Sequence, residues 1–333
     1  MSLRILRPGM FTTVQDLGRS EHQRFGVPVS GAMDSWALRV ANLLVGNDEG
    51  DAALEVTLTG PTIRFETGAL IAITGADLGA TLGEAPLAPW HAACAPSGAM
   101  LSFGGAAVGC RAYIAIAGGI PITPVLGSRS TFVRAALGGY MGRPLRRGDV
   151  LPCGEPSSLA RRIASATGGG KAGATVARWS AGAALRPAYS AAPTVRVLPG
   201  THAHLLSAPS ADRLYGATFG VSPQSDRMGY RLQGCALELG APAELLSEGV
   251  AFGTVQLPPG GDPIILMADR QTTGGYPRIG EVATVDLPLV AQLRPGDSVR
   301  FRRVSLERAQ ALYLAREHDL AEARRAIALR FPE

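Results

Sequence analysis

The sequence has 333 residues, and at roughly 150 residues per domain this length indicates two domains, each able to bury a core. Hydrophobic residues make up 46% of the chain and charged residues 18%, a composition that excludes intrinsic disorder. Glycine (42) and proline (24) are abundant while aromatic residues are only 6%, which favours many short strands joined by tight turns. We therefore expect a mainly β protein.

Charge, apolar stretches and cysteine spacing limit the location and the partners. The net charge of +5 comes from basic residues interleaved with acidic ones and without spaced aromatic residues, so no nucleic-acid partner is predicted. The longest apolar stretch, residues 112–120, is far below the roughly 20 residues of a membrane span, and no signal peptide is recognisable. Four distant cysteines without a C-x-x-C pattern fit reduced thiols. These features predict a cytoplasmic protein with no membrane partner.

The predicted strands are short, and most are bounded by glycine or proline. In chain order they cover residues 53–59, 70–74, 111–116, 195–198, 250–257, 264–268, 282–286 and 298–304. One helix is predicted to begin after Asp34, whose carboxylate can cap it, and to stop at Gly46. An amphipathic helix is predicted at the C-terminus, because apolar residues recur every seven positions from Leu306 to Ile327.

A low-complexity segment over residues 152–193 divides the chain and is predicted to be a connection. Short matches recur in the same order on both sides of it: residues 25–28 (FGVP) parallel residues 219–222 (FGVS), and an aspartate follows each. This order favours an ancient duplication. The predicted organisation is a β-barrel-like half over 1–151, the connection over 152–193, a β-barrel over 194–305 and the C-terminal helix over 306–333.

Three polar clusters stand out where predicted strands give way to loops. The first contains Ser128, Arg129 and Ser130, and its hydroxyls and guanidinium suit the binding of an anion. A capped helix start with a solvated arginine explains the same residues equally well. The second places Asp226 beside Arg227, which can orient the carboxylate. Its alternative is a surface ion pair worth about 0–1 kcal/mol.

The third cluster follows directly after the apolar segment 264–267, in residues 268–277 (ADRQTTGGYP). A run of polar residues and glycines at the end of a core strand is an unusual way to build a simple turn, so we interpret it as a functional loop. Its predicted substrate-binding residues are Gln271, Thr272, Thr273, Gly274 and Tyr276.

The three clusters are predicted to converge on one cleft. Asp226 and Asp269 are the catalytic candidates, either to orient a group or to accept a proton, and Arg129 and Arg227 are expected to hold a carboxylate or phosphate of the substrate. No metal site is predicted, because the pair His202 and His204 has no evident third ligand.

These loops, together with residues 26–47 (GVPVSGAMDSWALRVANLLVGN) and 126–145 (LGSRSTFVRAALGGYMGRPL), carry a family resemblance. From about residue 3 to 305 the chain resembles the biotin-dependent carboxyltransferase family of the allophanate hydrolase subunit 2 type, and most of all its 5-oxoprolinase members. The resemblance implies two related cyclophilin-like β-barrel halves with few helices. It also implies a partner subunit related to allophanate hydrolase subunit 1.

Three functions follow from this resemblance. The chain is expected to act with that partner and a LamB/YcsF-type subunit to open 5-oxo-L-proline to L-glutamate with ATP, and to be inactive alone. The alternative is the carboxyltransferase part of a biotin-dependent, urea-type carboxylase, although the chain contains no biotin-carrying segment. A third possibility is a regulatory protein that antagonises a kinase inhibitor. Which subunit binds ATP and which holds the catalytic residues is left open.

Overall fold

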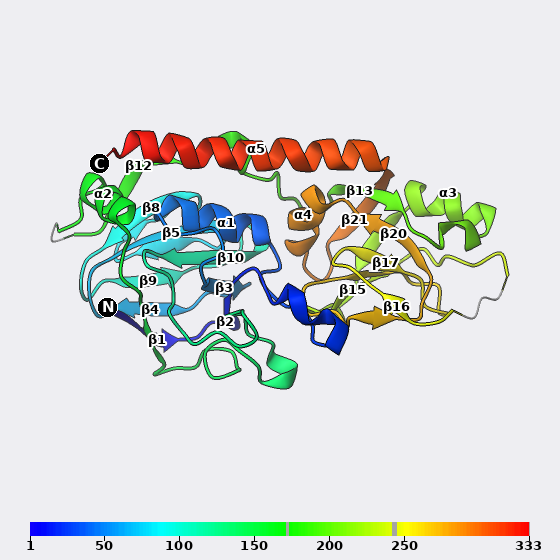
Figure 1. Cartoon of the computed structure of the whole chain (residues 1–333), viewed down its shortest axis with the longest axis horizontal. Coiled ribbons are helices and arrows are strands. Elements are labelled where there is room, and N and C mark those ends of the chain that lie inside the picture. Colours follow the sequence, from blue (N-terminus) through cyan, green and yellow to red (C-terminus); the bar gives the residue numbers. More distant parts are fainter. Residues whose placement is uncertain (171–172, 242–244, 333) are drawn as a thin grey trace. The chain divides into compact units, whose positions relative to one another are not determined.

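The computed structural model describes residues 1–170, 173–241 and 245–332, which form two compact units (Figure 1). Unit 1 contains Met1–Arg19, Asp34–Pro187 and the residues from His318 on. Unit 2 contains Ser20–Met33 and Ala188–Glu317. The segment Ser20–Met33 therefore belongs to unit 2, although the residues before and after it belong to unit 1. No change in composition marks the ends of this segment in the sequence.

Unit 1 is built from two six-stranded antiparallel sheets. In spatial order the first contains β11 (Val150–Pro152), β1 (Ser2–Arg7), β4 (Thr62–Phe65), β9 (Met100–Phe103), β6 (Ala80–Leu82) and β7 (Ala85–Pro86). The second contains β12 (Thr175–Ser180), β8 (His91–Ala95), β5 (Ala69–Asp77), β10 (Val108–Ile116), β3 (Ala53–Thr57) and β2 (Phe11–Gln15). Apolar side chains of both sheets, such as Ile5, Phe65, Val56 and Ile114, form one core.

Helix α1 (Ser35–Leu44) covers the outer face of the second sheet, which explains why β5 and β10 are buried on both faces. The predicted helix is confirmed at both ends. The Asp34 carboxylate accepts a hydrogen bond from the Ala37 amide at 2.9 Å, and Gly46 follows the last turn with a φ of +73°. At Gly46 a Cβ would lie 2.8 Å from the Ala160 nitrogen, so no larger residue fits this stop.

The segment 152–193 is mostly ordered structure of unit 1. Helix α2 (Ser158–Thr167) begins at the Ser157 cap, and β12 pairs with β8 at the edge of the second sheet. Only the part after Pro187 passes to unit 2.

Unit 2 is a closed barrel, in which only β13 and β21 are parallel neighbours. Around the barrel the strands are β13 (Thr194–Pro199), β20 (Arg278–Val282), β17 (Thr254–Gln256), β18 (Ile264–Leu266), β15 (Gly229–Gln233), β14 (Thr218–Val221) and β21 (Ser298–Arg303). The short strands β16 (Glu248–Gly249) and β19 (Thr273–Gly274) pair beside it, and helices α3 (Ala208–Gly216) and α4 (Leu287–Ala291) complete the unit. The mainly β class with few helices is confirmed.

The strand predicted at residues 282–286 is wrong. Strand β20 ends at Val282, and Thr284–Asp286 form a 3-10 turn. The Asp286 carboxylate accepts hydrogen bonds from the backbone amide (2.6 Å) and Nε (2.8 Å) of Arg196, which fixes the turn, and Pro288 lies in the first turn of the following helix. The apolar residues between 282 and 290 therefore face the core from a turn and a helix.

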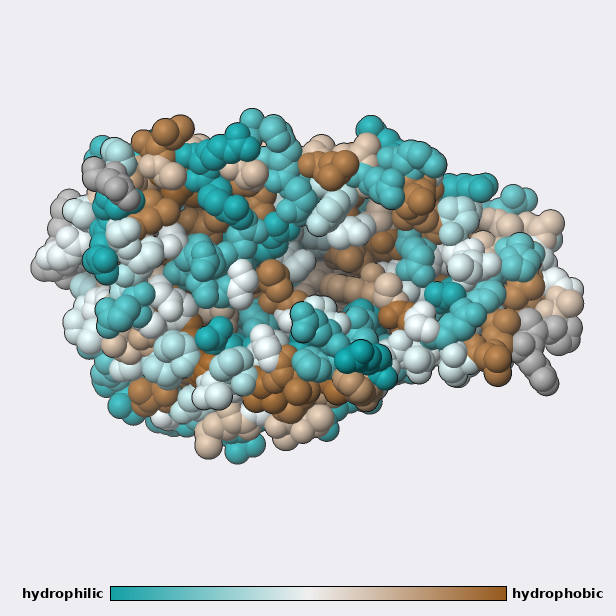
Figure 2. Space-filling model, in the orientation of Figure 1, coloured by the Kyte–Doolittle hydropathy of each residue, from teal (hydrophilic) through white to brown (hydrophobic). Residues whose placement is uncertain are grey.

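The predicted C-terminal helix is α5 (Leu306–Arg330), whose first part belongs to unit 2 and whose last part belongs to unit 1. Of its apolar residues only Leu320 is buried, while Leu306 and Tyr313 are exposed. Along the top of Figure 2, where Figure 1 places α5, brown patches alternate with teal ones. No helix in the described ranges is both long and apolar enough to cross a bilayer.

The barrel core predicts a large loss of stability on truncation. Phe219 is fully buried and its ring centroid lies 5.4 Å from that of Phe301. Phe219→Ala should destabilise unit 2 by about 3–5 kcal/mol. Phe25, in the same unit but 68% exposed, is the control, and Phe25→Ala should change stability by less than about 0.5 kcal/mol. Urea unfolding followed by circular dichroism measures both, and equal midpoints would contradict this packing.

Candidate functional site

Strand register brings two of the three polar clusters together in unit 2. Strands β15 and β18 are antiparallel neighbours, with Gly229 opposite Leu266. Beyond their ends the ladder continues, because the Met267 amide donates to the Met228 carbonyl (2.9 Å) and the Asp269 amide donates to the Arg227 carbonyl (2.8 Å). The side chains of Arg227 and Asp269 are therefore placed side by side at one end of the barrel.

Arg227 and Asp269 form a two-pronged ion pair. Nε of Arg227 donates to Oδ2 of Asp269 at 2.8 Å, and Nη2 donates to Oδ1 at 3.1 Å. The side chains are only 11% and 8% exposed, so water screens the pair weakly. Losing one partner of such a buried pair typically costs about 3–5 kcal/mol.

The segment Ser20–Met33 supplies further contacts of this pair. The Ser30 hydroxyl donates to Oδ1 of Asp269 at 2.7 Å, and Nη2 of Arg227 donates to the Gly31 carbonyl at 2.6 Å. Because the Asp269 carboxylate accepts hydrogen bonds from both Ser30 and Arg227, it is suited to orient these neighbours. Sequence reasoning missed Ser30, since no local pattern marks it; it has a φ of +57°, in the left-handed region.

Asp226 precedes Arg227 and shapes the turn at this point. It is exposed, and its Oδ1 accepts hydrogen bonds from the amides of Met228 (2.8 Å) and Gly229 (3.2 Å). This is the geometry of an aspartate that closes a tight turn. The turn directs the chain into β15 and thereby sets the position of Arg227.

The same loop contains a second buried charged side chain, that of Arg270. Arg270 is 7% exposed, and its hydrogen bonds are long: Nε lies 3.4 Å from the Val250 carbonyl and Nη1 lies 3.5 Å from the Met267 carbonyl. Burial lowers the pKa of Arg270 to about 10, although the charge of Glu281 opposes this shift. Burial also raises the pKa of Glu281, whose carboxylate accepts a hydrogen bond from Thr254 at 2.9 Å.

The rest of the loop presents polar groups outward. Gln271 and Thr272 are half-buried, Thr273 is exposed, and their side chains make no hydrogen bond to any residue that the structure describes. Tyr276 is 46% exposed. These side chains are available for a substrate or a partner, and their predicted role in binding a substrate stays a prediction.

At Gly274 there is no room for a side chain. A Cβ there would lie 2.5 Å from Nε2 of the buried Gln256. The loop is thus pressed onto the barrel at Gly274, and this fixes the course of its outward side chains.

The first polar cluster, Ser128–Ser130, lies in unit 1, where it binds a carboxylate of the chain itself, that of Asp16. Ser128 is buried, and its hydroxyl donates to Oδ1 of the buried Asp16 at 2.6 Å. The Ser130 hydroxyl and the Arg129 amide also donate to this carboxylate. The Arg129 side chain donates from Nε to the Ile122 carbonyl at 2.9 Å. The hydroxyls predicted to bind substrate are therefore engaged with Asp16.

Because Ser128–Ser130 belong to unit 1 and the other two clusters to unit 2, the single cleft stays a prediction. Among the described residues no group of three or more His, Cys, Asp or Glu side chains is arranged to hold a metal ion.

Comparison with known proteins supports a family assignment. The family model described as "carboxyltransferase domain, subdomain A and B" matches residues 25–303. The C subunit of the 5-oxoprolinase of Escherichia coli (strain K12) is 41% identical over 312 residues, which cover 92% of this chain and 93% of that protein. The corresponding 5-oxoprolinase chain of Haemophilus influenzae is 38% identical over 315 residues, 95% of each protein.

A solved structure supports the same family assignment. The crystal structure of the Kluyveromyces lactis urea amidolyase matches with a TM-score of 0.87 at 32% identity, covering 97% of this chain and 20% of that one. This chain therefore spans about a fifth of the length of the urea amidolyase that it resembles. The family resemblance of the loop motifs is confirmed, and the chain belongs to the carboxyltransferase domain family of subdomains A and B.

Proposed function

We propose that this chain is a subunit of an ATP-dependent 5-oxoprolinase that opens 5-oxo-L-proline to L-glutamate. The observation that carries the proposal is identity of 41% and 38% to two 5-oxoprolinase C subunits over at least 92% of each protein. The proposed partners are a subunit related to allophanate hydrolase subunit 1 and a LamB/YcsF-type subunit. The chain alone is proposed to be inactive.

The chemistry explains why such a reaction needs ATP and a polar loop. A five-membered lactam is a poor electrophile, and transfer of a phosphoryl group to its oxygen would make the carbonyl carbon reactive towards water. Water then adds to that carbon and the ring C–N bond breaks as the nitrogen takes up a proton, which gives an acyl phosphate. A second water hydrolyses this acyl phosphate to the carboxylate of glutamate and phosphate. The hydroxyls of Thr272 and Thr273 and the amide of Gln271 are proposed to hydrogen-bond the lactam. Asp269 is proposed to keep Arg227 and the start of this loop in place.

Carboxyl transfer from a biotin-dependent carboxylase is the second candidate. It is favoured by the TM-score of 0.87 to the urea amidolyase structure. In that case the same loop would receive the acceptor amide. The difference in coverage, 93% of the 5-oxoprolinase chain against 20% of the urea amidolyase, favours the first proposal.

Reconstitution tests the proposed reaction directly. The chain should be purified alone and with its two proposed partners in every combination, and glutamate release from 5-oxoproline should be measured with and without ATP. We expect release only when all three proteins and ATP are present. Full ATP-dependent activity without this chain would refute the proposal, and carboxybiotin-dependent carboxylation of urea instead would support the second candidate.

The loop can be tested separately from assembly. Replacing Gln271, Thr272 and Thr273 together by alanine should lower ATP-dependent glutamate release at least about 100-fold, because the substrate loses several hydrogen bonds. Co-elution with the partners in size-exclusion chromatography should be unchanged. A matched control replaces the exposed Gln233, Thr194 and Thr218 of the barrel by alanine, and this variant should keep full activity. Unaltered activity in the loop variant would favour a purely regulatory role.

A further inference from the structure

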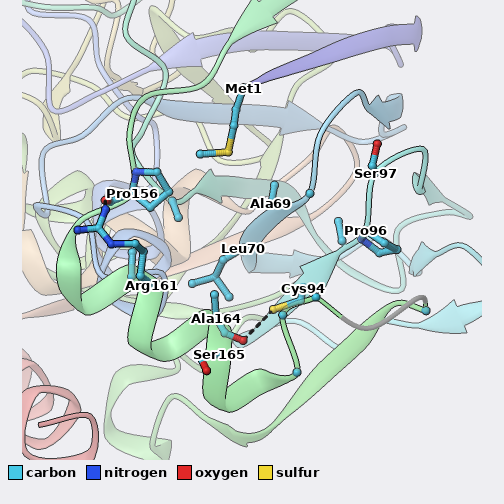
Figure 3. A pocket seen from close by; sticks show the side chains of 18 residues that line it. Met1, Ala69, Leu70, Cys94, Pro96, Ser97, Pro156, Arg161, Ala164 and Ser165 are labelled. Carbon is cyan, nitrogen blue, oxygen red and sulfur yellow. Dashed lines mark hydrogen bonds between the residues drawn. The ribbon is translucent and has the colours of Figure 1, made fainter. Parts of the chain in front are cut away.

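Unit 1 contains a pocket of about 560 Å³ that neither the proposed reaction nor the loop of unit 2 uses. Its floor is formed where β5 and β8 run side by side, with Leu70 opposite Cys94. Helix α2 covers one side through Ala160 and Ala164. Figure 3 shows Leu70, Cys94 and Ala164 in the middle of the pocket, with Pro156 and Arg161 at one side and Pro96 and Ser97 at the other.

The lining is mostly apolar, and its one thiol is inert. The Cys94 thiol donates to the Ala164 carbonyl at 3.5 Å, and burial raises the pKa of this thiol, so it stays protonated at neutral pH. The volume lies within the range of about 300–1,000 Å³ that small-molecule sites occupy. The pocket is therefore suited to the body of an organic molecule and not to covalent chemistry.

Among the described residues, Arg161 is the one charged side chain that lines the pocket, and it is exposed to solvent. Its Nη1 donates to the Pro156 carbonyl at 2.6 Å, and in the described part of the chain no acidic side chain pairs with it. The other N–H groups of this guanidinium have no partner among the described residues, and the side chain lies beside Pro156 at the edge of the pocket (Figure 3). A planar guanidinium is matched best by a carboxylate, which accepts two parallel hydrogen bonds from it. No Asp or Glu among the described residues lines the pocket, so no carboxylate there repels an anion.

We propose that this pocket binds a small organic carboxylate with an aliphatic or aromatic body. The body would lie between Leu70 and the Ala160–Ala164 face of α2, and the carboxylate would pair with Arg161. The proposal concerns unit 1 alone and is independent of the reaction proposed for the loop in unit 2.

The test measures binding to the intact chain by calorimetry and by NMR chemical shifts, with phenylbutyrate as the probe. Its uncharged amide tests the need for the carboxylate, and acetate tests the need for the apolar body. We expect saturable binding of phenylbutyrate, weaker binding of the amide by at least about tenfold, and no binding of acetate.

Variants locate the binding. Ala164→Phe should fill the pocket and abolish binding, and Arg161→Gln should reduce the affinity for phenylbutyrate to that for the amide. Ala166→Phe, on the exposed side of the same helix, is the control and should bind normally. If Ala164→Phe does not fold, Ala69→Leu narrows the pocket from the strand side instead. No saturable binding to the wild type, or equal binding to the filled variants, would overturn the proposal.

Discussion

The ion pair between Arg227 and Asp269 is the interaction on which the candidate site depends. It joins the turn before β15 to the loop after β18, and through Ser30 and Gly31 it also fixes the segment that the N-terminal part of the chain contributes to unit 2. A carboxylate with this much burial needs such partners, because an unpaired charge there would be strongly unfavourable. The need to pair the buried Asp269 carboxylate therefore fixes the position of the polar loop that begins at Asp269.

The same loop combines a fixed backbone with available side chains. Gly274 is pressed against Gln256, and β19 pairs with β16, so the backbone has little freedom. Gln271, Thr272 and Thr273 are nevertheless not engaged by the described residues of the chain. A preorganised backbone with unengaged polar groups is what substrate recognition requires, since ordering costs are already met by folding. In unit 1, by contrast, the hydroxyls of Ser128 and Ser130 are not available, because both donate hydrogen bonds to the Asp16 carboxylate.

Local sequence patterns predicted the mainly β class and helix α1 well, because both depend on neighbouring residues. They also marked the loop after β18, whose role in binding stays a prediction. The Asp34 cap and the Gly46 stop act within one helix, and a polar run after a core strand is visible within a short stretch of sequence. What failed depended on distant contacts. The turn at Thr284–Asp286 is set by Arg196, 90 residues before Asp286, and resembles a strand locally. The role of Ser30 and the engagement of Ser128 by Asp16 likewise come from tertiary structure.

Arg227 and Asp269 are proposed to act as one unit that holds the loop of the proposed reaction. A double-mutant cycle tests this claim most directly, with Arg227→Gln, Asp269→Asn and the double variant assembled with the partner subunits, and kcat for glutamate release as the readout. We predict that each single substitution lowers kcat at least about tenfold and that the double variant is no slower than the slower of the two single variants. Losses that add up independently, or single variants with normal kcat, would contradict the claim.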